Sequence, residues 1–387
     1  MILYIELCNF LDHPLGGHLS FAKHLTHAMQ GELHLVGITT DDSEPIGEWF
    51  KKEVEGYSYS VLNIYKTSRT ANKPLIPNRI KDYCRLKKSV HLIDFEAYDT
   101  IVIQTPEVLL ALPDSCLSKV VLIMPGVENP LSISRYALAR RFQGIYDKVF
   151  FSKAQKVRVI LAAADKQSIE ACILRSQGKI SETQIVQFPT RYDGSIFKQK
   201  NKEQLRESYN LQQETKLIVT TGRLSWVKGW KLMIDSFEMF HRVHLDSMLV
   251  FIGDGEERQK IERYIESLRL EQSIKLLGYQ TLEIISDYLN MADLFILGSY
   301  KEGWSTSLVE AVSCGVPCVV TDFSSASEMV HDGVNGFVML NRDEKDFSSS
   351  MERALLLDKS GIIQSANNIQ NLSVSNMKQS FINAIKV

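Results

Sequence analysis

The sequence lacks several features that would assign it to a membrane, secreted or nucleic-acid-binding class. None of its 387 residues lies in a run approaching the roughly 20 consecutive apolar residues of a membrane span. The N-terminus, MILYIELCNF, has no basic segment, long apolar segment or small-residue cleavage site, so we expect a cytoplasmic protein. The formal net charge of −2 provides no basic excess for a phosphate backbone, and we expect no nucleic-acid partner.

Motifs for metals, redox chemistry and dinucleotides are also missing. The six cysteines form no Cys-x-x-Cys pair, and several lie in apolar runs, so we interpret them as reduced core thiols. No Gly-x-Gly-x-x-Gly fingerprint stands in the first strand-to-helix turn of either half, which disfavours a nicotinamide-dependent enzyme. Five histidines crowd one region without a second ligand type at metal-binding spacing, and we expect no metal there: His13, His18, His24, His27 and His34.

What the sequence does contain is a repeated α/β pattern. A content of 44% hydrophobic and 23% charged residues is typical of a packed globular protein. Two domains are expected, because a single core rarely grows beyond about 250–300 residues. Apolar runs bounded by turn residues alternate with amphipathic stretches in both halves, which indicates parallel-sheet domains. The expected strands are ILYIEL, ELHLVGI, DTIVIQT and KVVLIMP, more weakly DKVFFS, VRVILAA and TQIVQFP, and then KLIVTTG, SMLVFIG, SIKLLGY, LFILGS and PCVVTD.

The two patterns meet in the segment FPTRYDGSIFKQK, residues 188–200. It carries proline, glycine and charges in place of a core pattern, so we interpret it as a linker. We therefore expect an N-terminal domain over residues 1–190 and a C-terminal domain over residues 200–365. Residues 43–88 show no clear strand-helix alternation, and we interpret them as elaborated loops or helices of the first domain.

Two glutamates, Glu302 and Glu310, follow the expected strand LFILGS and enter the helical stretch SLVEAVSCG. If a helix begins near Ser305, its free N–H groups and positive dipole end can bind a diphosphate. Glu302 would then lie in the loop and Glu310 inside the helix, where one carboxylate can reach a donor sugar and the other the ribose hydroxyls. The alternative is a chance pair of glutamates in a charged helix.

Two cations, Arg223 and Lys228, occupy a glycine-bounded loop directly after the expected strand KLIVTTG. A guanidinium and an ammonium in this place would neutralise a leaving diphosphate. The alternative is two solvated surface charges. The turn Gly253-Asp254-Gly255 after SMLVFIG would let main chain approach a ligand, or it is a plain turn.

Together these motifs make the second half similar to the retaining glycosyltransferase family 4, whose members have the GT-B fold. The resemblance covers roughly residues 214–340 and depends on the order and spacing of Gly222-Arg223, Lys228-Gly229, Gly253-Asp254-Gly255, Leu277-Gly278-Tyr279, Ala292-Asp293, Glu302, Glu310-Ala311, Cys314-Gly315-Val316-Pro317, Glu328 and Asp332-Gly333-Val334-Asn335-Gly336-Phe337. It implies two Rossmann-like domains facing each other across a cleft, with the donor between them. It also implies that a helix within residues 366–387 returns to the first domain.

The resemblance implies roles for the charged residues, with Arg223 and Lys228 on the diphosphate, Glu310 on the ribose and Glu302 near the transferred sugar. Further donor contacts are implied for main chain at Gly278 and Tyr279 near the base, and for phosphate-facing amides at Trp304, Ser305 and Thr306.

The first half resembles the family through the glycine-rich loop His13-Pro-Leu-Gly16-Gly17-His18, before a helix expected to begin near Leu19. Glycines there, Gly17 in particular, would admit donor phosphates and the acceptor; a simple tight turn is the alternative. Where many members carry a histidine, this chain has Pro125. The family also usually has Pro-Ser where this chain has Gly298-Ser299, and glycine in place of Ser305.

The implied reaction is transfer of a hexose-type sugar, with retention of configuration, from a nucleotide-diphosphate sugar to a glycan or lipid-linked acceptor in polysaccharide or glycolipid biosynthesis. The leaving diphosphate assists the incoming hydroxyl, so no dedicated base is required. We expect no metal, because the cationic side chains and the helix N-terminus take its place at the phosphates. Whether His13 or His18 positions the acceptor stays open. The alternatives are a non-catalytic GT-B subunit of a glycan-assembly complex and a GT-B sugar-nucleotide epimerase.

Two basic stretches of the first half also contain aromatic residues, namely Lys66–Lys88 and Arg135–Arg158. A solvated face is the usual explanation. The alternative is contact with an anionic membrane surface or a pyrophosphate-linked lipid acceptor, which would place the protein peripherally at the inner face of the membrane.

Overall fold

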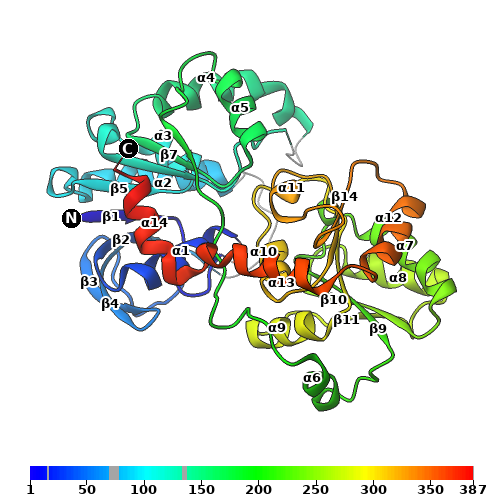
Figure 1. Cartoon of the computed structure of the whole chain (residues 1–387). Helices are drawn as coiled ribbons and strands as arrows, with labels where there is room; N and C mark the ends of the chain where they lie inside the picture. The colour runs from blue at the N-terminus through cyan, green and yellow to red at the C-terminus, as the bar shows by residue number, and fades with distance from the viewer. Residues whose placement is uncertain (15–16, 69–77, 133–136, 387) are drawn as a thin grey trace. The chain divides into compact units, whose positions relative to one another are not determined.

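The computed structural model describes residues 1–14, 17–68, 78–132 and 137–386 (Figure 1). The chain divides into two compact units, the first formed by Met1–Thr190 with Val374–Val387 and the second by Arg191–Ser373. Each unit is built around one sheet with helices packed on it. No helix within the described ranges combines the length and the apolar character that a membrane crossing requires.

The first unit contains an eight-stranded sheet in the order β3-β4-β2-β1-β5-β6-β7-β8. Its strands are β1 (Ile2–Ile5), β2 (Leu33–Thr39), β3 (Trp49–Val54), β4 (Tyr57–Lys66), β5 (Thr100–Ile103), β6 (Val120–Met124), β7 (Val159–Ala162) and β8 (Ile185–Gln187). Neighbouring strands pair in parallel except β3, which is antiparallel to β4. Six of these strands fall in segments predicted as strands.

The hairpin of β3 and β4 corrects the interpretation of residues 43–88 as loops or helices, whereas α2 (Asn78–Ser89) is a helix as expected. Its turn uses Glu55 at φ 50° and Gly56 at φ 79°, which permits a tight reversal. β3 is an edge strand with the sequence WFKKEV, and its lysines and glutamate suit an edge that must not pair further. Along β3, exposed positions alternate with more covered ones, but most of the side chains are charged or aromatic. A search for apolar runs therefore misses this strand.

A second correction concerns DKVFFS, predicted weakly as a strand. This segment lies within helix α4 (Gln143–Ala154), which buries Phe150, Phe151 and Ala154 against the sheet. A short apolar run of this kind fits a buried strand and a buried helix turn equally well.

Helices cover both faces of the first sheet. They are α1 (Gly17–Met29), α2 (Asn78–Ser89), α3 (Pro106–Ala111), α4, α5 (Lys166–Arg175) and α14 (Met377–Ala384). α14 comes from the end of the chain and packs beside α1, where Met377 and Phe381 are buried in one cluster with Leu19 and Leu25 (Figure 1). This unit is therefore completed by a segment far away in the sequence.

The second unit contains a six-stranded parallel sheet in the order β11-β10-β9-β12-β13-β14. Its strands are β9 (Lys216–Thr221), β10 (Ser247–Ile252), β11 (Ile274–Leu276), β12 (Leu294–Leu297), β13 (Cys318–Thr321) and β14 (Gly336–Met339). All but β14 were predicted. Counted within the unit the order is 3-2-1-4-5-6, so the strand order reverses between β9 and β12.

The helices of the second unit are α6 (Lys202–Ser208), α7 (Trp230–Val243), α8 (Arg258–Leu268), α9 (Leu282–Met291), α10 (Thr306–Ser313), α11 (Ala326–Met329), α12 (Glu344–Ala354) and α13 (Lys359–Asn368). α7 shows why they form: Met233, Ile234, Phe237 and Phe240 recur at helical spacing and are all buried in the core.

The segment predicted as a linker, residues 188–200, is packed over much of its length. Phe197 is buried, and Ser286 on α9 donates its hydroxyl to the carbonyl of Ile196. The Tyr192 amide donates to Leu372 O at 3.2 Å, and Tyr192 forms a bridge with Ser373. The two ends of the second unit therefore lie beside each other.

Candidate functional site

The carboxyl ends of β9 and β12 are the switch point of the second sheet, where open α/β sheets bind ligands. Arg223 and Lys228 lie in the loop between β9 and α7, and Glu302 lies in the loop between β12 and α10. The predicted charged residues thus come from the two loops that flank this point.

These two loops touch through their main chains. Gly229 adopts φ +65°, and a Cβ added to it would lie 1.8 Å from Gly298 O. The amide of Tyr300 donates to Val227 O at 2.7 Å. Only a residue without a side chain fits at Gly229, and this contact brings Lys228 and Glu302 together.

Lys228 and Glu302 form an ion pair, with Lys228 Nζ 2.6 Å from Glu302 Oε1. The Ser299 hydroxyl donates to the same oxygen at 2.6 Å. The two charged side chains are mostly covered, with exposed fractions of 24% and 15%. Such a pair gains more from its charge-assisted hydrogen bond than an exposed pair does.

The ammonium of Lys228 also lies over the start of the loop. Gly222 has φ +130°, and a Cβ built there would lie 3.7 Å from Lys228 Nζ and 3.6 Å from Ser307 Oγ. Ser307 is in the first turn of α10, so the cation, glycine main chain and helix start share one small region. This is the composition expected of an anion site.

The prediction that a helix begins near Ser305 is confirmed, because Ser305 is the N-cap of α10 and its hydroxyl accepts from the amide of Leu308. The amide of Ser305 itself donates to Ser325 Oγ at 3.1 Å, which sequence reasoning did not anticipate. Trp304 is buried and Thr306 is partly exposed. A phosphate contact of these three amides stays a prediction.

Glu310 lies inside α10 as expected. The residue as a whole is partly exposed, and its carboxyl group is surrounded by protein. Burial raises the pKa of Glu310 to about 8, and the nearby positive charge of Lys228 opposes this rise. The carboxyl therefore holds its proton at neutral pH in this structure. A protonated carboxyl can both donate and accept a hydrogen bond, which suits a hydroxyl partner such as ribose.

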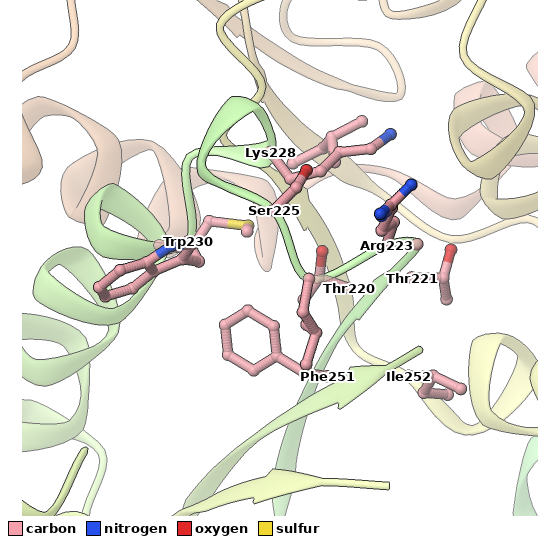
Figure 2. Close-up of a pocket in the computed structure, with 12 residues that line it drawn as sticks. Thr220, Thr221, Arg223, Ser225, Lys228, Trp230, Phe251 and Ile252 are labelled. Atoms are coloured by element: carbon pink, nitrogen blue, oxygen red, sulfur yellow. The ribbon is translucent and has the colours of Figure 1, made fainter. Parts of the chain in front are cut away.

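Arg223 differs from the other three charged residues. Its Nε donates to Glu256 Oε2 at 2.9 Å, and its side chain is 69% exposed. Figure 2 shows Arg223, Ser225 and Lys228 projecting from the same loop, with Trp230 at the other end of it. The structure thus brings Lys228, Glu302 and Glu310 together and pairs Arg223 with Glu256.

The turns after β9, β10 and β11 are stacked by their glycines. A Cβ added to Gly253, at φ +138°, would lie 2.0 Å from Gly222 O, and the Gly253 amide donates to Gly278 O at 2.9 Å. A Cβ on Gly255 would meet Leu224 O at 2.4 Å. The glycines of Gly253-Asp254-Gly255 therefore let this turn pack closely against the main chain of the turn after β9. Tyr279, next to Gly278, is exposed.

Sequence reasoning missed Arg342, which holds the loop after β12. Its guanidinium donates to Gly298 O at 2.9 Å and to Ser299 O at 2.5 Å, and it lies 3.9 Å from the ring centroid of Tyr300. The Thr321 hydroxyl donates to Ser299 O at 2.7 Å. A lone arginine in a polar loop gives no signal in a sequence, because only the fold brings it to its partners.

In the first unit, α1 begins at Gly17, two residues before the predicted start. A Cβ added to Gly17 would meet nothing within 4 Å, so space alone does not require glycine there. Gly16 lies outside the described residues. Pro125 follows β6 and is exposed.

Buried polar groups gather at the carboxyl ends of β1 and β5, the switch point of the first sheet, and sequence reasoning missed two of them. Glu6 follows β1, and burial raises its pKa to about 8. Gln104 follows β5 and donates to His18 O at 3.2 Å. Burial lowers the pKa of His18 to about 4, so this imidazole is neutral above that pH.

Several cations of the two basic stretches have partners within the protein. Lys66 pairs with Asp42, Lys156 pairs with Asp114, and Arg85 lies 4.4 Å from the ring centroid of Tyr65. Arg69, Lys73 and Arg135 lie outside the described residues. In the described ranges, no group of three or more His, Cys, Asp or Glu side chains has a metal-binding arrangement.

The profile of the family described as "Glycosyl transferases group 1" matches residues 201–371. The matched residues lie within the second unit, which is therefore similar to the domain of this family. An uncharacterized glycosyltransferase of Methanocaldococcus jannaschii is 24% identical over 282 residues, which are 71% of this chain and 66% of that protein. The chain thus spans just under two thirds of that relative's length. The profile and the name of this relative support the predicted transferase class.

Solved structures extend the similarity from the second unit to the whole chain. Sucrose-phosphate synthase from Thermosynechococcus elongatus gives a TM-score of 0.76 at 16% identity, over 100% of this chain and 99% of the other. Anabaena HepE, solved in complex with UDP and glucose, gives a TM-score of 0.71 at 16% identity, over 100% of this chain and 99% of HepE. The predicted GT-B fold, with two parallel-sheet domains, is confirmed.

Proposed function

We propose that this protein transfers a hexose-type sugar from a nucleotide-diphosphate sugar to a glycan or lipid-linked acceptor, with retention of configuration. The observation that carries the proposal is the cluster of Lys228, Glu302 and Glu310 at the switch point of the second unit, beside the start of α10. A cation and a helix N-terminus suit a diphosphate, and two carboxyl groups suit the hydroxyls of a ribose and a sugar.

In the proposed reaction, Lys228 neutralises charge on the leaving diphosphate, and Arg223 joins it by exchanging Glu256 for a phosphate oxygen. Glu310 binds ribose, Glu302 binds the transferred sugar, and main chain at Gly278 and Tyr279 lies against the base. The leaving diphosphate assists the incoming hydroxyl, so we assign no separate base. Lys228, Arg223 and the start of α10 take the place of a metal at the phosphates. The retaining, family 4 assignment rests on the motifs of residues 214–340.

UDP-glucose is the first donor to test, because HepE was solved in complex with UDP and glucose. Thermal shift with a panel of nucleotide sugars should give one clear stabilisation, since a ligand that binds only the folded state raises the melting temperature. Failure of every nucleotide sugar and every free nucleoside diphosphate to stabilise the protein would refute a donor site.

Incubation of the stabilising donor with and without acceptors separates the reaction types. Sugar transfer needs an acceptor, whereas epimerisation gives a new nucleotide sugar without one, and a non-catalytic subunit binds without turnover. Peripheral membrane contact through the basic stretches is part of the proposal for a lipid-linked acceptor. Flotation with vesicles that contain or lack anionic lipid tests it, and a distribution insensitive to both lipid and salt would remove it.

A further inference from the structure

A groove on the second unit lies outside the cluster described above and has no assigned role. We call it the aromatic groove. It has a volume of about 650 Å³, within the range of about 300–1,000 Å³ typical of ligand sites. Residues around the start of α7, one side of α8 and the loop after β12 line it, among them Trp226, Trp230, Tyr264, Tyr300, Lys260 and Arg263.

Two aromatic rings stand at the groove with more than half of their surface exposed. Trp226 and Tyr300 are 55% and 53% exposed, and their ring centroids are 5.7 Å apart. Trp230 is buried, with its ring centroid 5.6 Å from that of Tyr264. Exposed aromatic surface concentrated in a hollow marks a binding surface, whereas single exposed side chains do not.

Hydrogen-bonding groups are mixed with these rings. Glu257 accepts from Trp230 Nε1 at 3.2 Å and from Lys260 Nζ at 3.2 Å. The hydroxyl of Tyr264 accepts from Lys231 Nζ at 2.8 Å. The groove therefore offers both donors and acceptors next to flat apolar faces.

The charges around the groove leave a positive excess. Lys231 is balanced by Asp235 at 2.6 Å, and Lys260 is balanced by Glu257. Arg263 donates its Nε to the neutral carbonyl of Gln259. Three cations thus face two carboxylates, and the surplus falls at Arg263.

We propose that the aromatic groove binds an oligosaccharide that carries acidic groups. A sugar ring has a face of C–H groups that stacks on an aromatic ring and an edge of hydroxyls that exchange hydrogen bonds with both donors and acceptors. The surplus cation favours a carboxylated or phosphorylated sugar. A lipid surface fits less well, because the groove is concave and the carboxylate of Glu257 lines it.

This inference goes beyond the proposed transfer reaction and needs no donor, so the two can fail separately. The test is titration calorimetry of the full-length protein with a short oligogalacturonide and with a malto-oligosaccharide of equal length. The oligogalacturonide should bind more tightly, and added salt should weaken it. Arg263→Glu should weaken its binding about tenfold or more, as expected for loss of a contact to a charged group. Trp226→Ala should do the same by removing the stacking face.

The matched control is Arg242→Glu. Arg242 is an exposed arginine on α7, paired with Glu238 four residues before it, and it is not among the residues that line the groove. It should leave the affinity unchanged. Because Trp226 lies in the same loop as Lys228, UDP binding is measured on the same variants. If Trp226→Ala alters UDP binding, the test of the groove depends on Arg263→Glu alone.

The inference would be overturned by no binding of either oligosaccharide, by equal binding of both, or by equal losses of affinity in the Arg263 and Arg242 variants. Binding to anionic vesicles without binding to any oligosaccharide would also overturn it, and would assign the surface to a membrane.

Discussion

Lys228 Nζ lies 2.6 Å from Glu302 Oε1, an oxygen that the Ser299 hydroxyl also contacts at 2.6 Å. The cation expected to bind a diphosphate is thus held by the carboxylate expected to contact the sugar. An incoming diphosphate must compete with Glu302 for Lys228, so the two roles are coupled through one ion pair.

Glu302→Ala should abolish transfer while UDP affinity stays within a few-fold of the wild-type value, because Lys228 loses a competitor when the carboxylate is removed. Lys228→Ala should lower UDP affinity about 10–100-fold, the usual effect of losing a hydrogen bond to a charged group. Titration calorimetry with UDP and a transfer assay measure both. Indistinguishable UDP binding in the two variants would contradict this division of roles.

Glu310→Ala should weaken nucleotide binding, and Glu310→Gln should change how stability depends on pH. Burial raises the pKa of Glu310 to about 8, whereas an unfolded glutamate ionises near its ordinary pKa of about 4.3. Between these values the unfolded chain releases a proton that the folded protein keeps, so the free energy of unfolding falls as pH rises through this window. Glutamine cannot ionise, so Glu310→Gln should gain stability relative to wild type as pH rises towards about 8.

Denaturant unfolding at a series of pH values measures this difference. Glu6→Gln is the matched variant in the first unit, because burial raises the pKa of Glu6 to about 8 as well. It should show the same trend, and the double variant should show the sum. A difference between Glu310→Gln and wild type that does not vary with pH would show that the buried carboxyl is ionised throughout.

Arg342→Ala should reduce kcat/KM for transfer by about tenfold or more. The change leaves Gly298 O and Ser299 O without their guanidinium donor, and the loop that carries Glu302 loses its support. Arg353→Ala is the control, because Arg353 also stacks on a ring, 4.0 Å from the centroid of Phe337, yet is not hydrogen-bonded to this loop. Equal losses of kcat/KM in the two variants, at equal melting temperatures, would exclude a positioning role for Arg342.

Gly229→Ala should disrupt UDP binding and lower the melting temperature. An added Cβ would lie 1.8 Å from Gly298 O, so the two site loops must separate. Gly333→Ala is the control: Gly333 also has positive φ, at +75°, but a Cβ there meets nothing within 4 Å. It should cost only the left-handed backbone strain, about 1–2 kcal/mol, and leave UDP binding intact. Retained UDP binding in Gly229→Ala would show that the loops tolerate separation.

Local pattern predicted most of both sheets, because a buried parallel strand is a short apolar run ended by glycine or another turn residue. The local pattern failed for β3, an edge strand whose sequence WFKKEV mixes charged residues with apolar ones. Only the pairing of β3 with β4 identifies it as a strand. It also failed for Phe150 and Phe151, since two adjacent aromatic residues do not distinguish a helix from a strand.

The proximity of Lys228, Glu302 and Glu310 was predictable, because these residues follow two strands that are neighbours at the switch point of the sheet. The partner of Arg223 was not, since an exposed arginine has many reachable carboxylates. Arg342 and Gln104 gave no signal either, because the partners to which each donates lie far away in the sequence.

α14, the last helix of the chain, packs beside α1 of the first unit, while residues 191–373 form the second unit without interruption. During synthesis, the ribosome must therefore deliver all of the second unit before Met377 and Phe381 can reach their places beside Leu19 and Leu25. The first unit emerges earlier but is finished later, and its nascent form exposes apolar surface that α14 will cover.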